Sequence, residues 1–120
     1  MTPQPTPNVS AEDVERVAAR DFPSDSPRVL EILKGYGGED WHREVERVRL
    51  AVLKLGAGDV DRLRAAIETA RQDYRDVVAA AEYPGYCRSI RPGADISDDE
   101  RQAIIDADWQ QYSRWLHDDT

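Results

Sequence analysis

The sequence predicts an all-α fold: a small bundle of four main helices plus a short N-terminal helix, with the third and fourth helices as a central antiparallel hairpin. Three observations predict this class. Apolar residues recur at steps of three and four, which places them on one face of an α-helix. No segment of useful length alternates apolar and polar residues as a strand does. The 120 residues suffice for one domain with a modest core.

The N-terminal end predicts an arm and a short helix. Residues 1–9 contain three prolines and few apolar side chains, so a disordered arm is expected there, followed by a single helical domain over 10–120. Ser10 is a suitable N-cap, and Asp13 places an acid in the first turn. A helix with a thin apolar face should therefore run over about 11–20.

The second and third helices are expected over about 27–34 and 39–55. Ser26 followed by Pro27 is a helix start signal, and the glycines after residue 34 stop this helix. The third helix is apolar on more than one side, which is typical of a central helix. Its main stripe, at steps of four and three, consists of Trp41, Val45, Val48, Val52 and Leu55.

The fourth helix, over about 60–81, has the longest amphipathic pattern. Asp59 is its N-cap, and Pro84 ends it because proline disfavours the α conformation at the residue before it. Only residues 56–58 separate it from the third helix, so the two are expected to run antiparallel. Its stripe consists of Val60, Leu63, Ile67, Ala70, Tyr74, Val77 and Ala81.

The last helix should follow a loop over 83–96. Ser97–Glu100 forms a capping box, which predicts a helix over about 98–116. Its stripe of Ile105, Trp109, Tyr112 and Leu116 is expected to face the bundle. The predicted core consists of Leu30, Leu33, Val45, Val48, Val52, Leu55, Leu63, Ile67, Tyr74, Val77, Ile105, Trp109 and Tyr112.

The chain is acidic, with a net charge of −8. Residues 95–120 hold eight acids against two arginines, a net charge of −6. Acidic surfaces are repelled by nucleic acids and anionic lipids, so neither is an expected partner. No apolar run reaches the roughly 20 residues of a membrane helix, and no signal peptide is recognisable. With a single cysteine and hence no internal disulfide, a cytoplasmic location is expected.

Four short segments carry a resemblance to a known group of proteins. They are ERVRLAVLKL (46–55), GD (58–59), DYRDV (73–77) and AEYP (81–84). In this order they resemble a group of short uncharacterised bacterial helical proteins, whose members share a helix, a tight turn, a long helix and a terminal Glu-Tyr-Pro. The likeness covers about residues 28–84, roughly half of the chain. No activity is known for the group, so the resemblance implies no catalytic or binding residue.

Four polar residues form the most obvious candidate for chemistry. Asp73 and Asp76 are three apart on the fourth helix, Glu82 follows, and His42 belongs to the helix that should pack against them. Carboxylates with a histidine can bind a divalent metal or act as acid and base. However, helical metal sites use a Glu-x-x-His motif on more than one helix, and none is present. We therefore favour ordinary surface charge, with no metal and no cofactor.

The aromatic and acidic residues of the C-terminal third are the candidate interaction surface. Exposed tryptophan beside a polar rim is typical of protein interfaces, but for the aromatic side chains we favour the interpretation that they close one end of the core. The acidic residues have three interpretations: solubility, docking onto a basic protein, and mimicry of a nucleic-acid backbone. The candidate surface consists of Tyr83, Tyr86, Arg88, Asp99, Asp106, Asp108 and Trp115.

The leading functional hypothesis is a non-enzymatic, cytoplasmic protein-interaction module whose partner is another protein. The first alternative is a small ligand-binding protein or enzyme, with a site at the C-terminus of the fourth helix. The second alternative is an acidic decoy for a DNA-binding protein. A monomer is the default expectation, and the near-heptad stripe of the fourth helix leaves a homodimer as an alternative.

Overall fold

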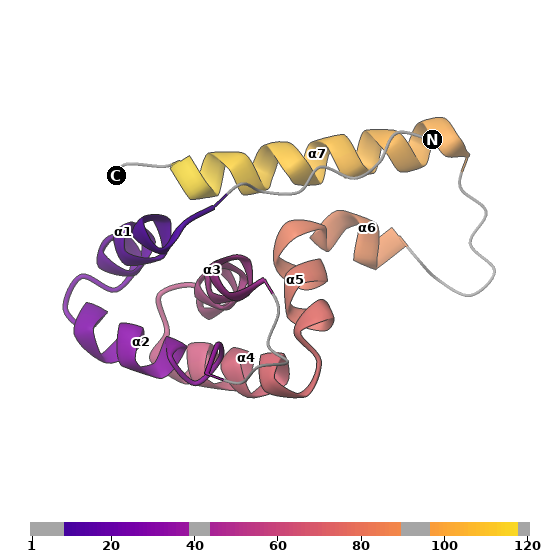
Figure 1. Ribbon diagram of the computed structural model, residues 1–120. Helices are drawn as coiled ribbons and strands as arrows, with labels where there is room; N and C mark the ends of the chain where they lie inside the picture. Colours follow the sequence, from indigo (N-terminus) through magenta and orange to yellow (C-terminus); the bar gives the residue numbers. More distant parts are fainter. Residues whose placement is uncertain (1–8, 39–43, 90–96, 118–120) are drawn as a thin grey trace.

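The computed structural model describes residues 9–38, 44–89 and 97–117. Within these ranges the chain forms seven α-helices and no strand, which confirms the predicted all-α class (Figure 1). Residues 1–8 of the predicted arm and Trp41 of the predicted third helix lie outside the described residues. The helices are α1 Ala11–Asp21, α2 Ser26–Leu33, α3 Val45–Gly56, α4 Val60–Gln72, α5 Tyr74–Glu82, α6 Pro84–Ser89 and α7 Asp98–His117.

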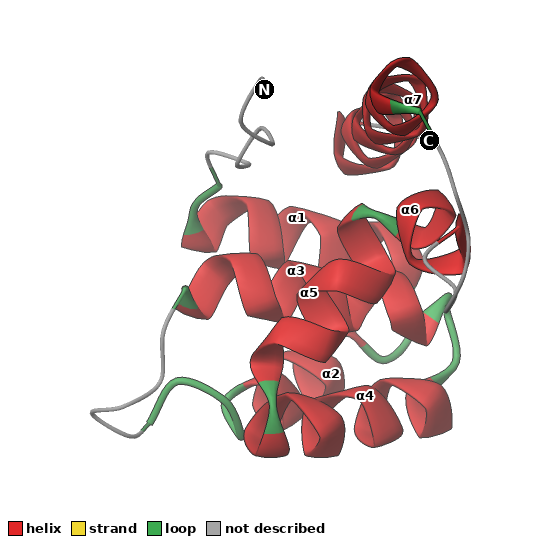
Figure 2. Ribbon diagram, turned by 90° about the vertical axis from the view of Figure 1, so that its right-hand side faces the viewer, coloured by secondary structure: helices red, strands yellow, loops and turns green. Residues whose placement is uncertain are grey.

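The helices lie in three layers. In both ribbon views α2 and α4 form one outer layer, α1, α3 and α5 form the middle layer, and α7 lies across the opposite side (Figures 1 and 2). The central helix α3 packs against α1, α4 and α5. The short α6 packs between α5 and α7, so it forms part of the support on which α7 rests.

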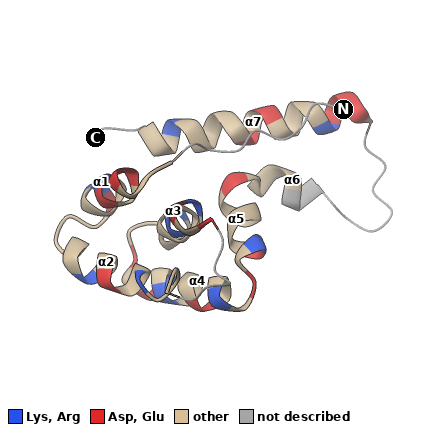
Figure 3. Ribbon diagram, in the orientation of Figure 1, with Lys and Arg blue, Asp and Glu red and all other residues tan. Residues whose placement is uncertain are grey.

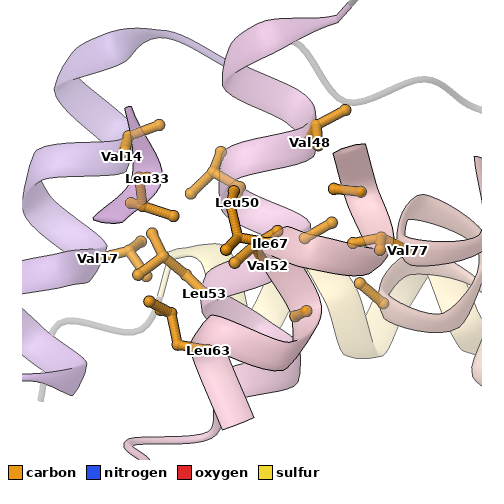
Figure 4. Packing of buried hydrophobic residues seen from close by; sticks show 14 of the residues in the cluster. Val14, Val17, Leu33, Val48, Leu50, Val52, Leu53, Leu63, Ile67 and Val77 are labelled. Carbon is orange, nitrogen blue, oxygen red and sulfur yellow. The ribbon is translucent and has the colours of Figure 1, made fainter. Parts of the chain in front are cut away.

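The core surrounds α3. Five residues of this helix, Val48 and residues 50–53, are fully buried, which confirms that α3 is central (Figure 4). Burying one such aliphatic side chain stabilises the fold by about 1.5–3 kcal/mol. Of the predicted core residues, Leu33, Val48, Val52, Leu63, Ile67, Val77, Ile105 and Tyr112 are buried. The others, Leu30, Val45, Leu55, Tyr74 and Trp109, are half-buried.

The predicted continuous helix over 60–81 is wrong, because the chain breaks at Asp73. This residue has an extended backbone (φ −153°, ψ 98°), so α4 ends before it and α5 begins after it. Its amide donates to the Thr69 carbonyl at 2.8 Å, and its carboxylate accepts from the Arg75 amide at 3.1 Å. A short carboxylate can cap the next helix in this way, which offsets the backbone hydrogen bonds lost at the break.

The loop predicted over 83–96 is also partly wrong, because residues 84–89 form α6. The prediction that Pro84 ends the preceding helix is confirmed, since α5 stops at Glu82. However, Pro84 is also the first residue of α6, where its missing N–H costs nothing. The turn after α3 is where it was expected: Ala57 takes a left-handed conformation (φ 50°), and the Asp59 carboxylate caps α4.

Candidate functional site

A buried ion pair joins α3 to the end of α5. The Arg47 guanidinium donates from Nε to Oε2 and from Nη2 to Oε1 of Glu82, both at 2.7 Å. The Glu82 side chain is 1% exposed and that of Arg47 is 20% exposed. The hydrogen bonds to Glu82 raise the pKa of Arg47 above its usual value. Because both oxygens of the Glu82 carboxylate accept hydrogen bonds from the Arg47 guanidinium, this pair links α3 to the end of α5.

A second buried carboxylate, Asp108, joins α7 to α6. Its Oδ1 accepts from the Gly85 amide at 3.0 Å, and its Oδ2 accepts from the Tyr86 amide at 2.8 Å. A Cβ on Gly85 would lie 2.7 Å from Oδ1, so only glycine permits this approach. Asp108 of α7 therefore binds two amides of the first turn of the neighbouring helix α6.

Further polar and aromatic contacts fix the inner side of α7. The Gln111 amide donates from Nε2 to the Asp108 carbonyl at 2.9 Å and reaches the Ala81 and Glu82 carbonyls at 3.5 Å. Tyr112 is fully buried between Trp109 and Trp115, with ring centroids 6.5 Å and 5.5 Å away. Burial raises the pKa of Tyr112, whose hydroxyl has no hydrogen-bond partner among the described residues.

Two arginines of α1 bind the C-terminal end of α7. Arg16 donates from Nη2 to the Leu116 carbonyl at 2.6 Å, and Arg20 donates from Nη1 to the Trp115 carbonyl at 2.5 Å. The Arg20 guanidinium also lies 5.3 Å from the centre of the Trp115 ring. Carbonyls in the last turn of a helix have no partner within the helix, so these contacts complete α7.

A cavity of about 600 Å³ opens between α1, α3 and α7. Lys54 of α3 projects its side chain into this region, and burial lowers the pKa of its ammonium group, an effect that nearby Asp108 opposes. The lining residues are Arg20, Asp21, Lys54, Ala57, Gly58, Gln111 and Trp115.

The residues of the predicted interaction surface differ in exposure: some are buried and others are exposed. Tyr83 and Asp108 are only 6% exposed and so do not form part of a surface, which corrects the prediction for these two residues. Both serve the α5–α6–α7 junction, where the Asp108 carboxylate binds backbone amides. Asp99 and Asp106 are exposed on α7 as expected. Tyr86 and Trp115 are half-buried, and the side chain of Arg88 lies outside the described residues.

The residues of the predicted polar cluster, His42, Asp73, Asp76 and Glu82, do not all lie together in the structure. Glu82 is buried against Arg47, Asp73 caps α5, and Asp76 is exposed. Hydrogen bonds from Arg75 lower the pKa of Asp73. His42 lies outside the described residues. Glu82 is therefore separated from Asp73 and Asp76, which both lie at the start of α5.

Among the described residues, no three histidine, cysteine or carboxylate groups gather as a metal site. Within the same ranges no helix is both long and apolar enough to cross a membrane. The chain matches no protein family model, no curated protein and no solved structure.

The residues that define the site were mostly absent from the sequence analysis. Among them are Arg16, Arg20, Arg47 and Lys54, for which the sequence predicted no role. A cation at 47 and another at 54 are seven apart, so they share one side of α3 with the buried Ala51. For Arg47 and Lys54 that spacing was a signal in the sequence; it says nothing about Arg16 and Arg20, which lie on α1.

Proposed function

We propose that the protein is a non-enzymatic, cytoplasmic protein-interaction module that binds a basic protein partner through the outer face of α7. This face is defined by Asp99, Ala103, Asp106, Gln110 and Arg114, all of which are exposed. In Figure 3 acidic residues mark the start and the middle of this helix.

The observation that carries the proposal is the contrast between the two sides of α7. Its inner side is fixed by Asp108, Gln111 and the arginines of α1, whereas its outer side is exposed and acidic. A helix held in place in this way presents its charges without further ordering on binding. Preorganisation of this kind lowers the entropic cost of association.

The two alternative functions receive less support from the geometry. A ligand site at the end of the predicted fourth helix would need Glu82 and Tyr83, which are buried, and Glu82 is paired with Arg47. A decoy for a DNA-binding protein would need a dense array of acids, whereas Asp99 and Asp106 are two helical turns apart. Docking onto a basic protein requires only a few such charges.

A pull-down from the native cell tests the proposal. The tagged full-length chain is compared with the variant Asp99→Asn/Asp106→Asn, at about 0.05 M and about 0.5 M salt, and retained proteins are identified by mass spectrometry. A stoichiometric partner of basic surface should be retained at low salt and lost at high salt. High salt should release the partner because it screens exposed charges, with a screening length of about 10 Å already at 0.1 M. The variant should lose the partner at both concentrations because it lacks the two carboxylate charges.

The matched control is Glu31→Gln/Glu68→Gln, which removes two exposed acids from α2 and α4. This control should keep the partner. Equal loss from both variants would reduce the effect to net charge and overturn the assignment to α7. Turnover of a substrate by the purified chain, abolished by Asp76→Asn, would favour the enzyme alternative instead.

We further propose, on the resemblance of residues 28–84, that the chain is related to the short bacterial helical proteins named above and acts as a monomer. The arrangement of its third and fourth helices as an antiparallel hairpin belongs to the same proposal. Contact between α3 and α4 across the short turn at 57–59 supports it.

A further inference from the structure

The cavity beside α7 has walls from three separate parts of the chain. Arg20 and Asp21 end α1, Lys54 lies near the end of α3, and the other walls are the turn after α3 and the α7 side chains of Gln111 and Trp115. Its volume of about 600 Å³ falls within the range of small-molecule sites. Gly58 contributes no side chain, so the turn leaves the space open.

The charges around the cavity do not cancel. Arg20 and Asp21 neutralise each other, with Nε and Oδ1 2.8 Å apart. Asp108 lies near Lys54, but both of its oxygens accept hydrogen bonds from amides of α6. No carboxylate of the described residues lies within ion-pair distance of the Lys54 ammonium. The half-buried Lys54 ammonium therefore has no direct ion-pair partner among the described residues, and the charge of Asp108 acts on it only from a distance.

A cation withdrawn from water without a partner destabilises the folded state, and a bound anion relieves that cost. The lining carries a net charge of about +1, counted over Arg20, Asp21 and Lys54, which suits a monoanion better than a phosphate dianion. The indole of Trp115 supplies an apolar wall next to the ammonium.

We propose that this cavity binds a small organic monocarboxylate, whose carboxylate pairs with Lys54 and whose apolar part lies against Trp115. This inference goes beyond the proposed partner binding, because it concerns the inner side of α7 and needs no protein partner. The oxygen of the Gln111 amide accepts no hydrogen bond from the described residues, so it can receive a donor group of the ligand.

The composition of the chain makes the test direct, because it contains only two lysines. Lys34 is exposed and lies on α2's C-terminal side, so it serves as an internal reference for Lys54. The full chain is labelled with ¹³C at lysine Cε and titrated with acetate, benzoate and indole-3-acetate, with benzamide as a neutral counterpart of benzoate. The resonance of Lys54 should shift and saturate with a dissociation constant on the order of 1 mM or below, while that of Lys34 stays in place.

Two variants and two further probes complete the test. Lys54→Gln should weaken binding of the best carboxylate at least about tenfold, as read from the Trp fluorescence, and Lys34→Gln should leave it unchanged. If Lys54→Gln does not fold, the comparison of benzoate with benzamide on the unmodified chain still decides. The proposal is overturned if no carboxylate shifts Lys54, if both lysines shift alike, if benzamide binds as well as benzoate, or if inorganic phosphate binds more tightly than every carboxylate.

Discussion

Replacing Glu82 by glutamine tests whether the pair with Arg47 holds the domain together. The substitution keeps the size of the side chain and removes its charge. One of the two 2.7 Å hydrogen bonds from the guanidinium can persist to the neutral amide oxygen, and the other is lost because the amide NH2 group is a donor that cannot accept. The Arg47 guanidinium then remains in a largely enclosed place, where the remaining carboxylate partner among the described residues is Glu44 at 3.8 Å.

The expected cost follows from the exposure of the two side chains. Removing one partner of a buried ion pair costs about 3–5 kcal/mol when the remaining charge is fully buried. Arg47 keeps 20% exposure and Glu44, so we expect Glu82→Gln to lower the free energy of unfolding by about 2–3 kcal/mol. A domain of this size has a total stability of about 5–15 kcal/mol, so the effect is readily measured.

Urea denaturation followed by circular dichroism at the helix band measures this difference. The matched control is Glu68→Gln, whose pair with Arg71 is 3.2 Å long but more than half exposed, and which should change the stability by less than about 0.5 kcal/mol. The double variant Arg47→Met/Glu82→Leu should return to within about 1 kcal/mol of the parent, because it leaves no unpaired charge. Equal stabilities for Glu82→Gln and Glu68→Gln would refute the reasoning.

Three further substitutions probe the support of α7 and the turn after α3. Tyr112→Phe removes a buried hydroxyl without a partner and should stabilise by up to about 1 kcal/mol in urea denaturation. Burial raises the pKa of Tyr112 above 10.0, so above that pH the unfolded chain loses a proton that the folded chain keeps. The free energy of unfolding then falls by about 1.4 kcal/mol per pH unit, and Tyr112→Phe should remove this contribution to the slope. Alanine usually stabilises a helix relative to glycine, but the Cβ of Gly85→Ala displaces the Asp108 carboxylate. The substitution should therefore reduce the free energy of unfolding by about 2 kcal/mol and lower the melting temperature; a higher melting temperature would contradict the contact. Ala57→Gly relieves a left-handed backbone and should stabilise by about 1 kcal/mol in calorimetry, whereas a loss would show that Ala57 is not strained.

The fold class was predictable because helical periodicity is a local property. The stripe of α3 and the cap at Asp59 needed no knowledge of neighbours: Val48 and Val52 of that stripe are buried, and the Asp59 carboxylate caps α4. The break at Asp73 was missed because the apolar stripe continues across it from Ala70 to Tyr74 and Val77. Aspartate favours N-cap positions, which argued for a helix start at Asp73, but the continuous apolar stripe argued for one uninterrupted helix.

The candidate site was harder to predict because its contacts join residues far apart in the chain. The Arg47–Glu82 pair spans 35 positions, and the Asp108–Gly85 contact spans 23. The predicted stripe of α7 placed Trp109 in the core and Asp108 outside. In the structure Asp108 is buried because the amides of α6 bind it, and α6 was itself unforeseen.

The contacts between α1 and α7 also set the order in which the domain can be completed during synthesis. Arg16 and Arg20 reach carbonyls 100 and 95 positions further along the chain. During translation, which proceeds from the N-terminus, these guanidinium groups have no carbonyls to bind until α7 has left the ribosome. Closure of so long a loop is slow compared with helix formation, so α1–α6 should gather first and α7 should dock last. Until α7 docks, the apolar residues of α1–α6 that pack with Tyr112 and Leu116 in the finished core remain uncovered.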